Sequence, residues 1–224
     1  MAKSPADVLK MMKEHNVKLV DLKFMDFIGS WQHFQLPAHN IEASTFEDGV
    51  NFDGSSIRAW QGLETSDMTV VPDATTAKID PFFADATLSL ICDIRDPVTG
   101  EDYSRDPRHV AKKAINYLRS TGIADTAYFG PEAEFFVFDS VRYDTHSGGG
   151  YYFIDSSEAP WTSGEAGGNV GYKVRPKQGY FPVAPSDSQQ DMRNEMVLIM
   201  EQLGLKIERA HHEVAPAQHE INFQ

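Results

Sequence analysis

The stretch FGPEAEFFVFD, residues 129–139, combines a dense run of aromatic and β-branched residues with two glutamates, Glu132 and Glu134. This composition predicts a β-strand. Side chains two positions apart in a strand lie on the same face, so both carboxylates point the same way. If they are buried, such a pair needs protonation, a basic partner or a bound cation. No Lys or Arg stands between the two glutamates, which favours a cation.

A second carboxylate pair occurs in HHEVAPAQHEI, residues 211–221, where Glu213 and Glu220 stand on either side of Pro216-Ala217. A hairpin centred on Pro216-Ala217 predicts that Glu213 lies directly across from Glu220. Opposed residues in such a ladder have Cβ atoms about 5 Å apart, so like charges there are destabilising unless a cation bridges them. Mg²⁺ and Mn²⁺ prefer oxygen ligands, and the four glutamates therefore indicate one or two such ions rather than zinc.

Two other interpretations of these residues stay open. Glutamates are ordinary residues at solvent-facing strand positions, where they need no ligand. His211 and His212 adjoin Glu213 and offer a nitrogen ligand, but neighbouring strand residues face opposite ways, so at most one of them points with Glu213. For either histidine alone, a structural role is favoured over metal binding.

The remaining patterns predict an α+β protein with two domains, residues 1–104 and 105–224. The division follows the turn-forming run at residues 96–100, after which Asp106-Pro107 begins a helix. The glycine-rich residues 144–171 predict a long loop. Helices are predicted at residues 4–16, 106–121 and 191–203, and strands at residues 19–27, 31–36, 68–71, 87–94, 128–138, 205–214 and 219–223.

Composition narrows the class of protein. The 224 residues carry a formal net charge of -13, which argues against nucleic-acid binding because that needs clustered Lys and Arg. The single cysteine, Cys92, lies in an apolar run and predicts an inert buried thiol in a reducing compartment. No apolar run approaches the roughly 20 residues of a membrane span, and a cytoplasmic protein is expected. The sequence stops within a strand-like pattern, Ile221-Asn222-Phe223-Gln224, which predicts a truncated chain.

Glycine-containing segments give weaker signals. Asp53-Gly54-Ser55-Ser56 is compatible with a phosphate loop, because glycine lets backbone amides approach an anion. A plain turn explains the same residues at least as well. Gly148-Gly149-Gly150 lacks the Lys and Ser/Thr of a phosphate loop.

Across essentially the whole chain, these residues resemble the bacterial type I class of glutamine synthetases. The motifs that carry the resemblance are NFDGSSIRAW (51–60), VPDATTAKIDPFF (71–83), DPRHVAKKA (106–114), FGPEAEFFVFD (129–139), QGYFPV (178–183) and HHEVAPAQHEI (211–221). The resemblance implies a β-grasp-like amino-terminal domain, followed by the first part of a barrel-like catalytic domain lined by metal ligands.

Carried over by motif position, the resemblance assigns roles to the glutamates. Glu134, Glu213 and Glu220 match ligands of the metal that helps to bind glutamate. Glu132 matches a ligand of the metal that serves the ATP phosphates. Mg²⁺ or Mn²⁺ is the implied ion, with two or more ions in each site.

The resemblance also implies roles for residues outside the carboxylate cluster. Asp53 matches the residue that binds ammonium and helps to remove its proton, and Tyr180 matches a tyrosine that lines the ammonium site. Glu208 matches a position near the nucleotide. Phe223 and Gln224 fall where a nucleotide-contacting strand begins.

The implied reaction is ATP-dependent ligation of ammonia to L-glutamate through γ-glutamyl phosphate. Family members form dodecamers of two stacked six-membered rings, with each active site between neighbouring subunits. They are about twice as long as this chain, and the absent half supplies further metal, substrate and phosphate ligands. The 224-residue chain is therefore expected to be inactive alone. The spacing of Glu213 and Glu220 matches the unmodified subclass, whereas the glycine-rich loop resembles the adenylylated one, so the subclass stays open.

Two alternatives compete with this function. A related ligase that glutamylates a polyamine or another amine would use the same ATP and metal groups, although Asp53 with Tyr180 favours ammonium. A noncatalytic metal-binding or assembly-modulating chain would also retain the four carboxylates.

Overall fold

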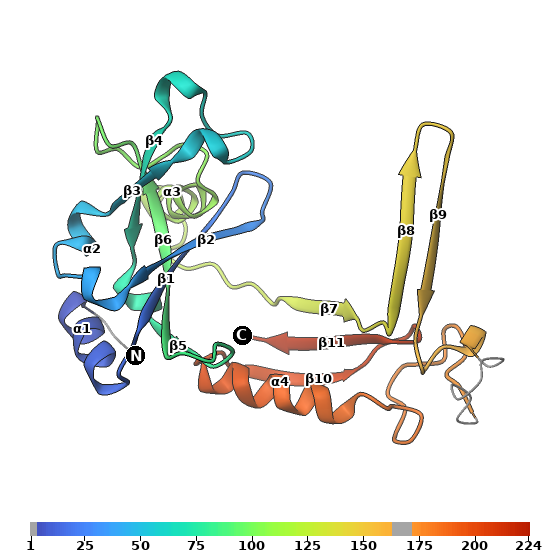
Figure 1. The fold of residues 1–224 in the computed structure, drawn as a ribbon. Helices are drawn as coiled ribbons and strands as arrows, with labels where there is room; N and C mark the ends of the chain where they lie inside the picture. Colours follow the sequence, from blue (N-terminus) through green and yellow to red (C-terminus); the bar gives the residue numbers. More distant parts are fainter. Residues whose placement is uncertain (1–3, 163–171) are drawn as a thin grey trace. The chain divides into compact units, whose positions relative to one another are not determined.

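The computed structural model describes residues 4–162 and 172–224, which divide into two compact units. The first unit extends to Ala127 and the second runs from Tyr128 to Gln224. Both units combine helices with β-sheet, which confirms the predicted α+β class (Figure 1).

The first unit contains a mixed sheet in the order β2-β1-β6-β4-β3, with β5 also paired to β6. The β1 strand runs parallel to β6, and the other pairs are antiparallel. Its elements are α1 (Pro5–Glu14), β1 (Leu19–Met25), β2 (Trp31–Pro37), α2 (Thr45–Asp48), β3 (Val50–Asp53), β4 (Asp67–Pro72), β5 (Lys78–Asp80), β6 (Thr87–Arg95) and α3 (Pro107–Ser120). Short 3-10 helices lie at Ala38–Asn40, Gly54–Ser56, Leu63–Thr65 and Ala74–Thr76.

The core of the first unit forms where β1 and β6 pair. Leu22 and Leu90 are opposite each other in that pair, and both are fully buried. Burial of a leucine side chain contributes about 1.5–3 kcal/mol, so the alternating apolar positions of these strands hold the sheet to its helices. Val8 and Met12 on α1 join this core. The predicted hairpin of residues 19–27 and 31–36 is confirmed as β1 and β2.

Charged side chains attach α3 to the sheet of the first unit. Asp106 caps the helix by accepting a hydrogen bond from the backbone N–H of Arg108. The Arg108 guanidinium pairs with Asp73 and with Asp93, and Lys112 pairs with Asp93 as well. The predicted helix at residues 106–121 is therefore confirmed, with its first turn fixed by ion pairs.

The second unit contains an antiparallel sheet in the order β10-β11-β7 and a separate two-stranded hairpin, β8-β9. The α4 helix packs along β10 (Figure 1). Its elements are β7 (Glu132–Phe136), β8 (Ser140–His146), β9 (Gly149–Asp155), a 3-10 helix (Pro160–Thr162), α4 (Gln190–Gln202), β10 (Ile207–His212) and β11 (Gln218–Phe223).

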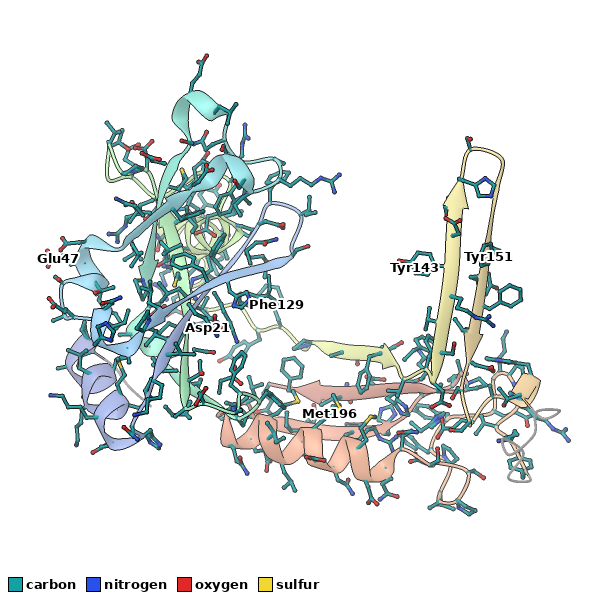
Figure 2. All side chains as sticks on the ribbon, in the orientation of Figure 1. Asp21, Glu47, Phe129, Tyr143, Tyr151 and Met196 are labelled. Carbon is teal, nitrogen blue, oxygen red and sulfur yellow. The ribbon has the colours of Figure 1, made fainter. Side chains whose placement is uncertain are left out.

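The prediction of a long loop at residues 144–171 is wrong for its first part, because β8 and β9 form a regular hairpin there. Tyr143 lies opposite Tyr152, and Arg142 lies over the Phe153 ring at 5.6 Å. Cross-strand pairs of this kind stabilise a ladder. Figure 2 labels Tyr143 and Tyr151 on this hairpin, which are 75% and 52% exposed. Residues 163–171 lie outside the described part of the chain.

The boundary predicted near residue 104 stays a prediction. The compact units divide at residues 127 and 128, which assigns α3 to the first unit. Within residues 4–162 and 172–224, no helix has the length and apolar character needed to cross a membrane.

Candidate metal site

One face of the three-stranded sheet carries a row of potential metal ligands. His211 on β10 lies opposite Glu220 on β11, and Glu220 lies opposite Glu134 on β7. Two positions further along, Asn222 lies opposite Glu132. Because strand side chains alternate between faces, these residues share one side of the sheet. The predicted common face for the glutamates on β7 and β11 is therefore present.

The predicted register of the β10-β11 hairpin is wrong. Glu213 lies next to Gln218, with its backbone N–H donating to the Gln218 carbonyl at 2.7 Å, and His211 takes the place opposite Glu220. The reason lies in the turn, where Gln218 donates its N–H to the Ala215 carbonyl and accepts from the Ala215 N–H through its side chain. These bonds close the turn earlier than a centre at Pro216-Ala217 allows. Relative to the prediction, the residue opposite Glu220 changes by two positions, from Glu213 to His211, so each side chain stays on the same face of the sheet.

Glu213, Glu220 and His211 converge despite the shifted register. Each offers one ligand atom, and the three atoms lie within 4.8 Å of one another. His211 Nδ1 is 3.6 Å from Glu213 Oε1, and His211 Nε2 is 3.6 Å from Glu220 Oε2. Both glutamates are buried, and none of the ion pairs between described residues joins either of them to Lys or Arg.

Glu134 and Glu132 flank this cluster. Glu134 is the neighbour of Glu220 across the ladder, and its Oε2 accepts a 2.6 Å hydrogen bond from the Gln218 side chain. Both β7 glutamates are exposed. Of the four carboxylates predicted as ligands, the structure thus brings Glu213 and Glu220 together and places Glu134 beside them. Glu132 lies two residues further along β7.

His211 also contacts an aromatic pair. The rings of Tyr180 and Phe181 stack at 3.9 Å, and both meet the His211 ring edge-on, at 5.4 and 4.6 Å. Tyr180, predicted to line an ammonium site, therefore lies next to the histidine of the cluster. The neighbouring Gly179 donates its N–H to the Val214 carbonyl at 2.9 Å, so this segment follows the strand end closely.

Behind the cluster, on the opposite face of the sheet, lies a buried polar network that the sequence did not reveal. His212 Nε2 is 2.9 Å from Glu158 Oε2, and His219 Nδ1 is 2.9 Å from the guanidinium of Arg193. Arg193 in turn forms an ion pair with Asp187. All five side chains are at most 5% exposed. The partners are far apart in the sequence, and no local pattern links His212 to Glu158 or His219 to Arg193.

The network sets the protonation of its members. Burial alone raises the pKa of Glu158, but hydrogen bonds from His212 and Ser188 outweigh it and lower that pKa to about 2. Burial lowers the pKa of His212, yet its bonds to Glu158 and to the Glu213 carbonyl raise it overall. Burial, followed by the charges of Arg193 and His212, lowers the pKa of His219 to about 4. One histidine is therefore stabilised as a cation and the other as a neutral ring.

Asp53 belongs to the first unit, at the end of β3. Its carboxylate accepts hydrogen bonds from the Ser55 hydroxyl at 2.6 Å, the Ser56 hydroxyl at 3.0 Å and the Ser55 backbone N–H at 2.9 Å. The Ser55 hydroxyl bond is the largest cause that lowers the pKa of Asp53. The segment forms a 3-10 turn, so Asp53 stays ionised and exposed, as a cation-binding carboxylate requires.

The predicted nucleotide-contacting residues lie at the far end of β10 and β11 from the Glu213 turn. Glu208 is exposed at an irregularity of β10, where its side chain pairs with Arg209 at 3.0 Å. Phe223 lies opposite Ile207, and Gln224 donates its backbone N–H to the Lys206 carbonyl. The structure groups these residues, and their nucleotide contacts stay a prediction.

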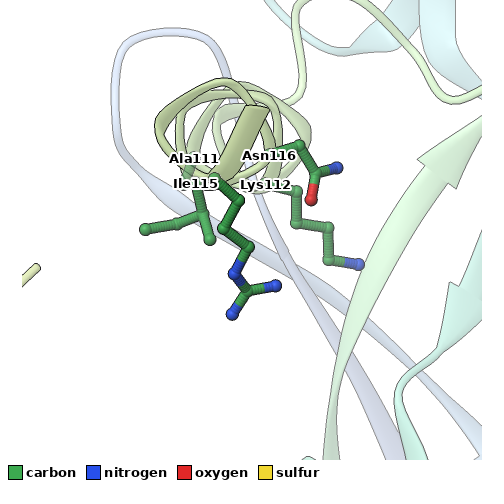
Figure 3. Close-up of a pocket in the computed structure, with 5 residues that line it drawn as sticks. Ala111, Lys112, Ile115 and Asn116 are labelled. Carbon is green, nitrogen blue, oxygen red and sulfur yellow. The ribbon is translucent and has the colours of Figure 1, made fainter. Parts of the chain in front are cut away.

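The first unit has a surface hollow along one side of α3. Figure 3 shows Ala111, Lys112, Ile115 and Asn116 around it, and Arg119 completes the lining. All of its lining residues belong to one helix, so the hollow is an open helix face. None of the predicted site residues contributes to it.

Comparison with protein families gives matches to both parts of the chain. The family model described as "Glutamine synthetase, beta-Grasp domain" matches residues 16–97, and "Glutamine synthetase, catalytic domain" matches residues 104–224. Together the two models cover most of the sequence and divide it into the two predicted kinds of domain.

Individual proteins give the same result. The chain is 54% identical to a glutamine synthetase of Microchaete diplosiphon over 99% of its length, and 55% identical to that of Escherichia coli K12 over 96%. It covers 47% and 46% of these proteins, and thus spans about half the length of the curated relatives it matches. A cryo-EM structure of Plasmodium falciparum glutamine synthetase matches with a TM-score of 0.87 at 27% identity, over 99% of this chain and 44% of that one. A structure titled "Apo GmaS without ligand" has a TM-score of 0.72 at 19% identity over 98% of this chain and 45% of that one, which shows a shared fold.

Proposed function

The chain belongs to the glutamine synthetase family, and on that premise we propose that its full-length protein is a glutamate–ammonia ligase that consumes ATP. The family and the β-grasp and catalytic domains expected from the motifs are confirmed by the comparisons. The activity itself is a proposal, because the chain spans only about half of the relatives that carry the name.

The observation that carries this proposal is the convergence of Glu213, Glu220 and His211 within 4.8 Å, with Glu134 next in the ladder. Among the described residues, neither of these two buried carboxylates forms an ion pair with Lys or Arg. The two carboxylates repel each other, and a divalent cation would remove that repulsion. A set rich in carboxylate oxygen suits Mg²⁺ or Mn²⁺. These residues therefore fit the metal that the family implies.

The proposed roles come from the motifs, and the grouping of Glu134, Glu213 and Glu220 supports the first of them. Glu134, Glu213 and Glu220 hold the metal that helps to bind glutamate, and Glu132 holds part of a second metal site that serves ATP. His211, on the same face, is an additional candidate ligand. When bound, the metals neutralise negative charge that gathers during phosphoryl transfer.

The reaction that we propose has two steps. The glutamate side-chain carboxylate attacks the γ-phosphate of ATP, which gives γ-glutamyl phosphate and ADP. Ammonia then displaces phosphate to give L-glutamine. Because ammonium has no lone pair, Asp53 binds the cation and helps to remove its proton, while Tyr180 lines the ammonium site. The low pKa of Asp53 favours cation binding. Glu208, Phe223 and Gln224 serve the nucleotide.

The assembly and location that we propose come from the family resemblance. The full-length protein forms a homo-oligomer, a dodecamer of two six-membered rings, with Asp53 of one subunit completing the site of its neighbour. It acts in the cytoplasm. The described residues contain no membrane-crossing helix, which is compatible with this location.

Activity of the full-length natural protein tests the proposal directly. Glutamate, ATP and Mg²⁺ or Mn²⁺ are supplied with ammonium, or with methylamine, ethylamine or a polyamine at equal concentration, and the amide product is identified by mass spectrometry. We expect ammonium to give the highest rate and L-glutamine as product. Faster ligation of another amine would contradict the substrate assignment, and an absence of ATP-dependent ligation with every amine would contradict the enzyme assignment.

A further inference from the structure

We propose that Glu158 and His212 are positioning residues, which hold Glu213 in place for metal binding from the opposite face of the sheet. This inference rests on the proposed metal site and concerns residues that have no motif-derived role. Glu158 lies in the segment between β9 and Pro160–Thr162, and His212 is the last residue of β10.

The His212 ring joins Glu158 directly to the backbone of Glu213. Its Nδ1 is 2.6 Å from the Glu213 carbonyl oxygen, and its Nε2 is 2.9 Å from Glu158 Oε2. Both partners are hydrogen-bond acceptors, so the ring is held at both ends. A ring held in this way fixes the peptide that carries Glu213.

Glu158 is itself anchored to the segment that precedes α4. Its Oε1 accepts a hydrogen bond from the Ser188 backbone N–H at 2.9 Å and another from the Ser188 hydroxyl at 2.8 Å. The contacts therefore form a chain from the α4 segment through Glu158 and His212 to Glu213. Glu158, His212 and Glu213 are buried, and the two bonds from the exposed Ser188 are partly buried, which limits their exchange with water.

The partner strand is held in the same way. His219 lies opposite His212 and directly precedes Glu220. Arg193 on α4 donates to His219 and pairs with Asp187. Both strands that bear the buried carboxylates thus have an inward histidine tied to α4 or to the segment before it.

Stability alone is a poor explanation for so many buried charges. Well-packed apolar residues of similar volume often stabilise a core as much as a buried ion pair does, or more. Hydrogen-bonded groups, by contrast, fix orientation, and residues that hold metal ligands commonly control metal affinity. The network can therefore serve to hold the two buried carboxylates in position.

The test compares Glu158→Gln with Thr162→Val in the full-length natural protein. Thr162 is equally buried and stabilises the same segment through bonds to the Ser156 and Ala159 carbonyls, without contact to His212. Mn²⁺ dissociation constants are measured by electron paramagnetic resonance of free Mn²⁺, and melting temperatures are measured in parallel. We expect Glu158→Gln to weaken Mn²⁺ binding about tenfold, and Thr162→Val to change it by less than about twofold.

Equal Mn²⁺ affinity in Glu158→Gln and the unaltered protein would overturn the proposal. It would also be overturned if both variants lost Mn²⁺ affinity in proportion to their fall in melting temperature. If Glu158→Gln does not fold, Ser188→Ala replaces it, with an expected loss of about threefold. Glu220→Ala separates the two proposals. Unchanged Mn²⁺ binding in that variant refutes the metal site itself, whereas a loss there with none in Glu158→Gln refutes only the positioning role.

Discussion

Replacement of Gly179 by alanine tests how tightly the Tyr180 segment is fitted to the carboxylate cluster. A Cβ at this position would lie 2.6 Å from the Glu213 carbonyl oxygen, 2.8 Å from that of Val214 and 3.0 Å from Val174 Cγ1. Ordinary carbon–oxygen contacts are about 3.3 Å or longer, so the strand end must retreat by about 0.7 Å. Two of the three obstructing atoms are backbone, which cannot yield by rotation of a side chain.

We expect Gly179→Ala to act on stability and on metal binding together. Overpacking of this kind costs about 1–3 kcal/mol, and the melting temperature should fall by several degrees. The displaced peptide is the one that carries Glu213, and metal ligands tolerate errors of only about 0.2 Å, so Mn²⁺ affinity should fall about tenfold or more. Thermal denaturation and Mn²⁺ titration of the full-length natural protein measure the two effects.

Gly62→Ala is the matched control for that substitution. Gly62 has a φ of −85°, and a Cβ added there meets no described atom within 4 Å. If Gly179→Ala and Gly62→Ala have the same melting temperature and the same Mn²⁺ dissociation constant, the backbone near Glu213 makes room for the added methyl group at no cost. The steric argument would then be refuted.

Three further predictions concern charges. Ser55→Ala removes the bond that contributes most to the low pKa of Asp53, so carboxyl NMR titration should show that pKa rising toward its usual range; no change would exclude the hydroxyl as cause. The pKa of His219 is about 4 when folded and near 6.5 when unfolded, so only the unfolded chain gains this proton as pH falls between those values. The free energy of unfolding should therefore decrease by up to about 3 kcal/mol as the pH falls toward 4. Chemical denaturation at several pH values should show a smaller decrease for His219→Gln. Arg108→Met leaves Asp93 without its guanidinium partner and should lower the free energy of unfolding by about 1–3 kcal/mol, whereas Lys10→Met, which breaks an exposed pair, should have little effect.

Local sequence signals predicted most elements of the fold. The hairpin of β1 and β2 and the helices α3 and α4 follow from apolar spacing and, for α3, from Asp106-Pro107. These signals act within a few residues. The common face of Glu132 and Glu134 follows in the same way, because strand periodicity is a local property. The loop prediction for the glycine-rich stretch is wrong because pairing with a partner strand, as between Tyr143 and Tyr152, outweighs the turn tendency of glycine.

The site was predictable only in part, for physical reasons. The residues of the carboxylate cluster are recognisable by type, but their register depends on hydrogen bonds inside the Val214–Ala217 turn. The register decides that His211, rather than His212, lies beside Glu220. Glu158 is 54 positions from His212, and no local pattern links the two.

Because β11 is paired with β10 on one side and with β7 on the other, its length is constrained during the evolution of this family. Glu220 is aligned with His211 through one neighbour and with Glu134 through the other, so an inserted residue within β11 would misalign it with both. The turn at residues 214–217 lies outside both ladders. Val214 and Ala217 at its ends accept bonds from Gly179 and Val137, but Pro216 between them belongs to no strand pair. Insertions and deletions among descendants of a common ancestor should therefore accumulate in that turn, and the number of residues between the two buried glutamates can drift while their alignment across the strands is inherited unchanged.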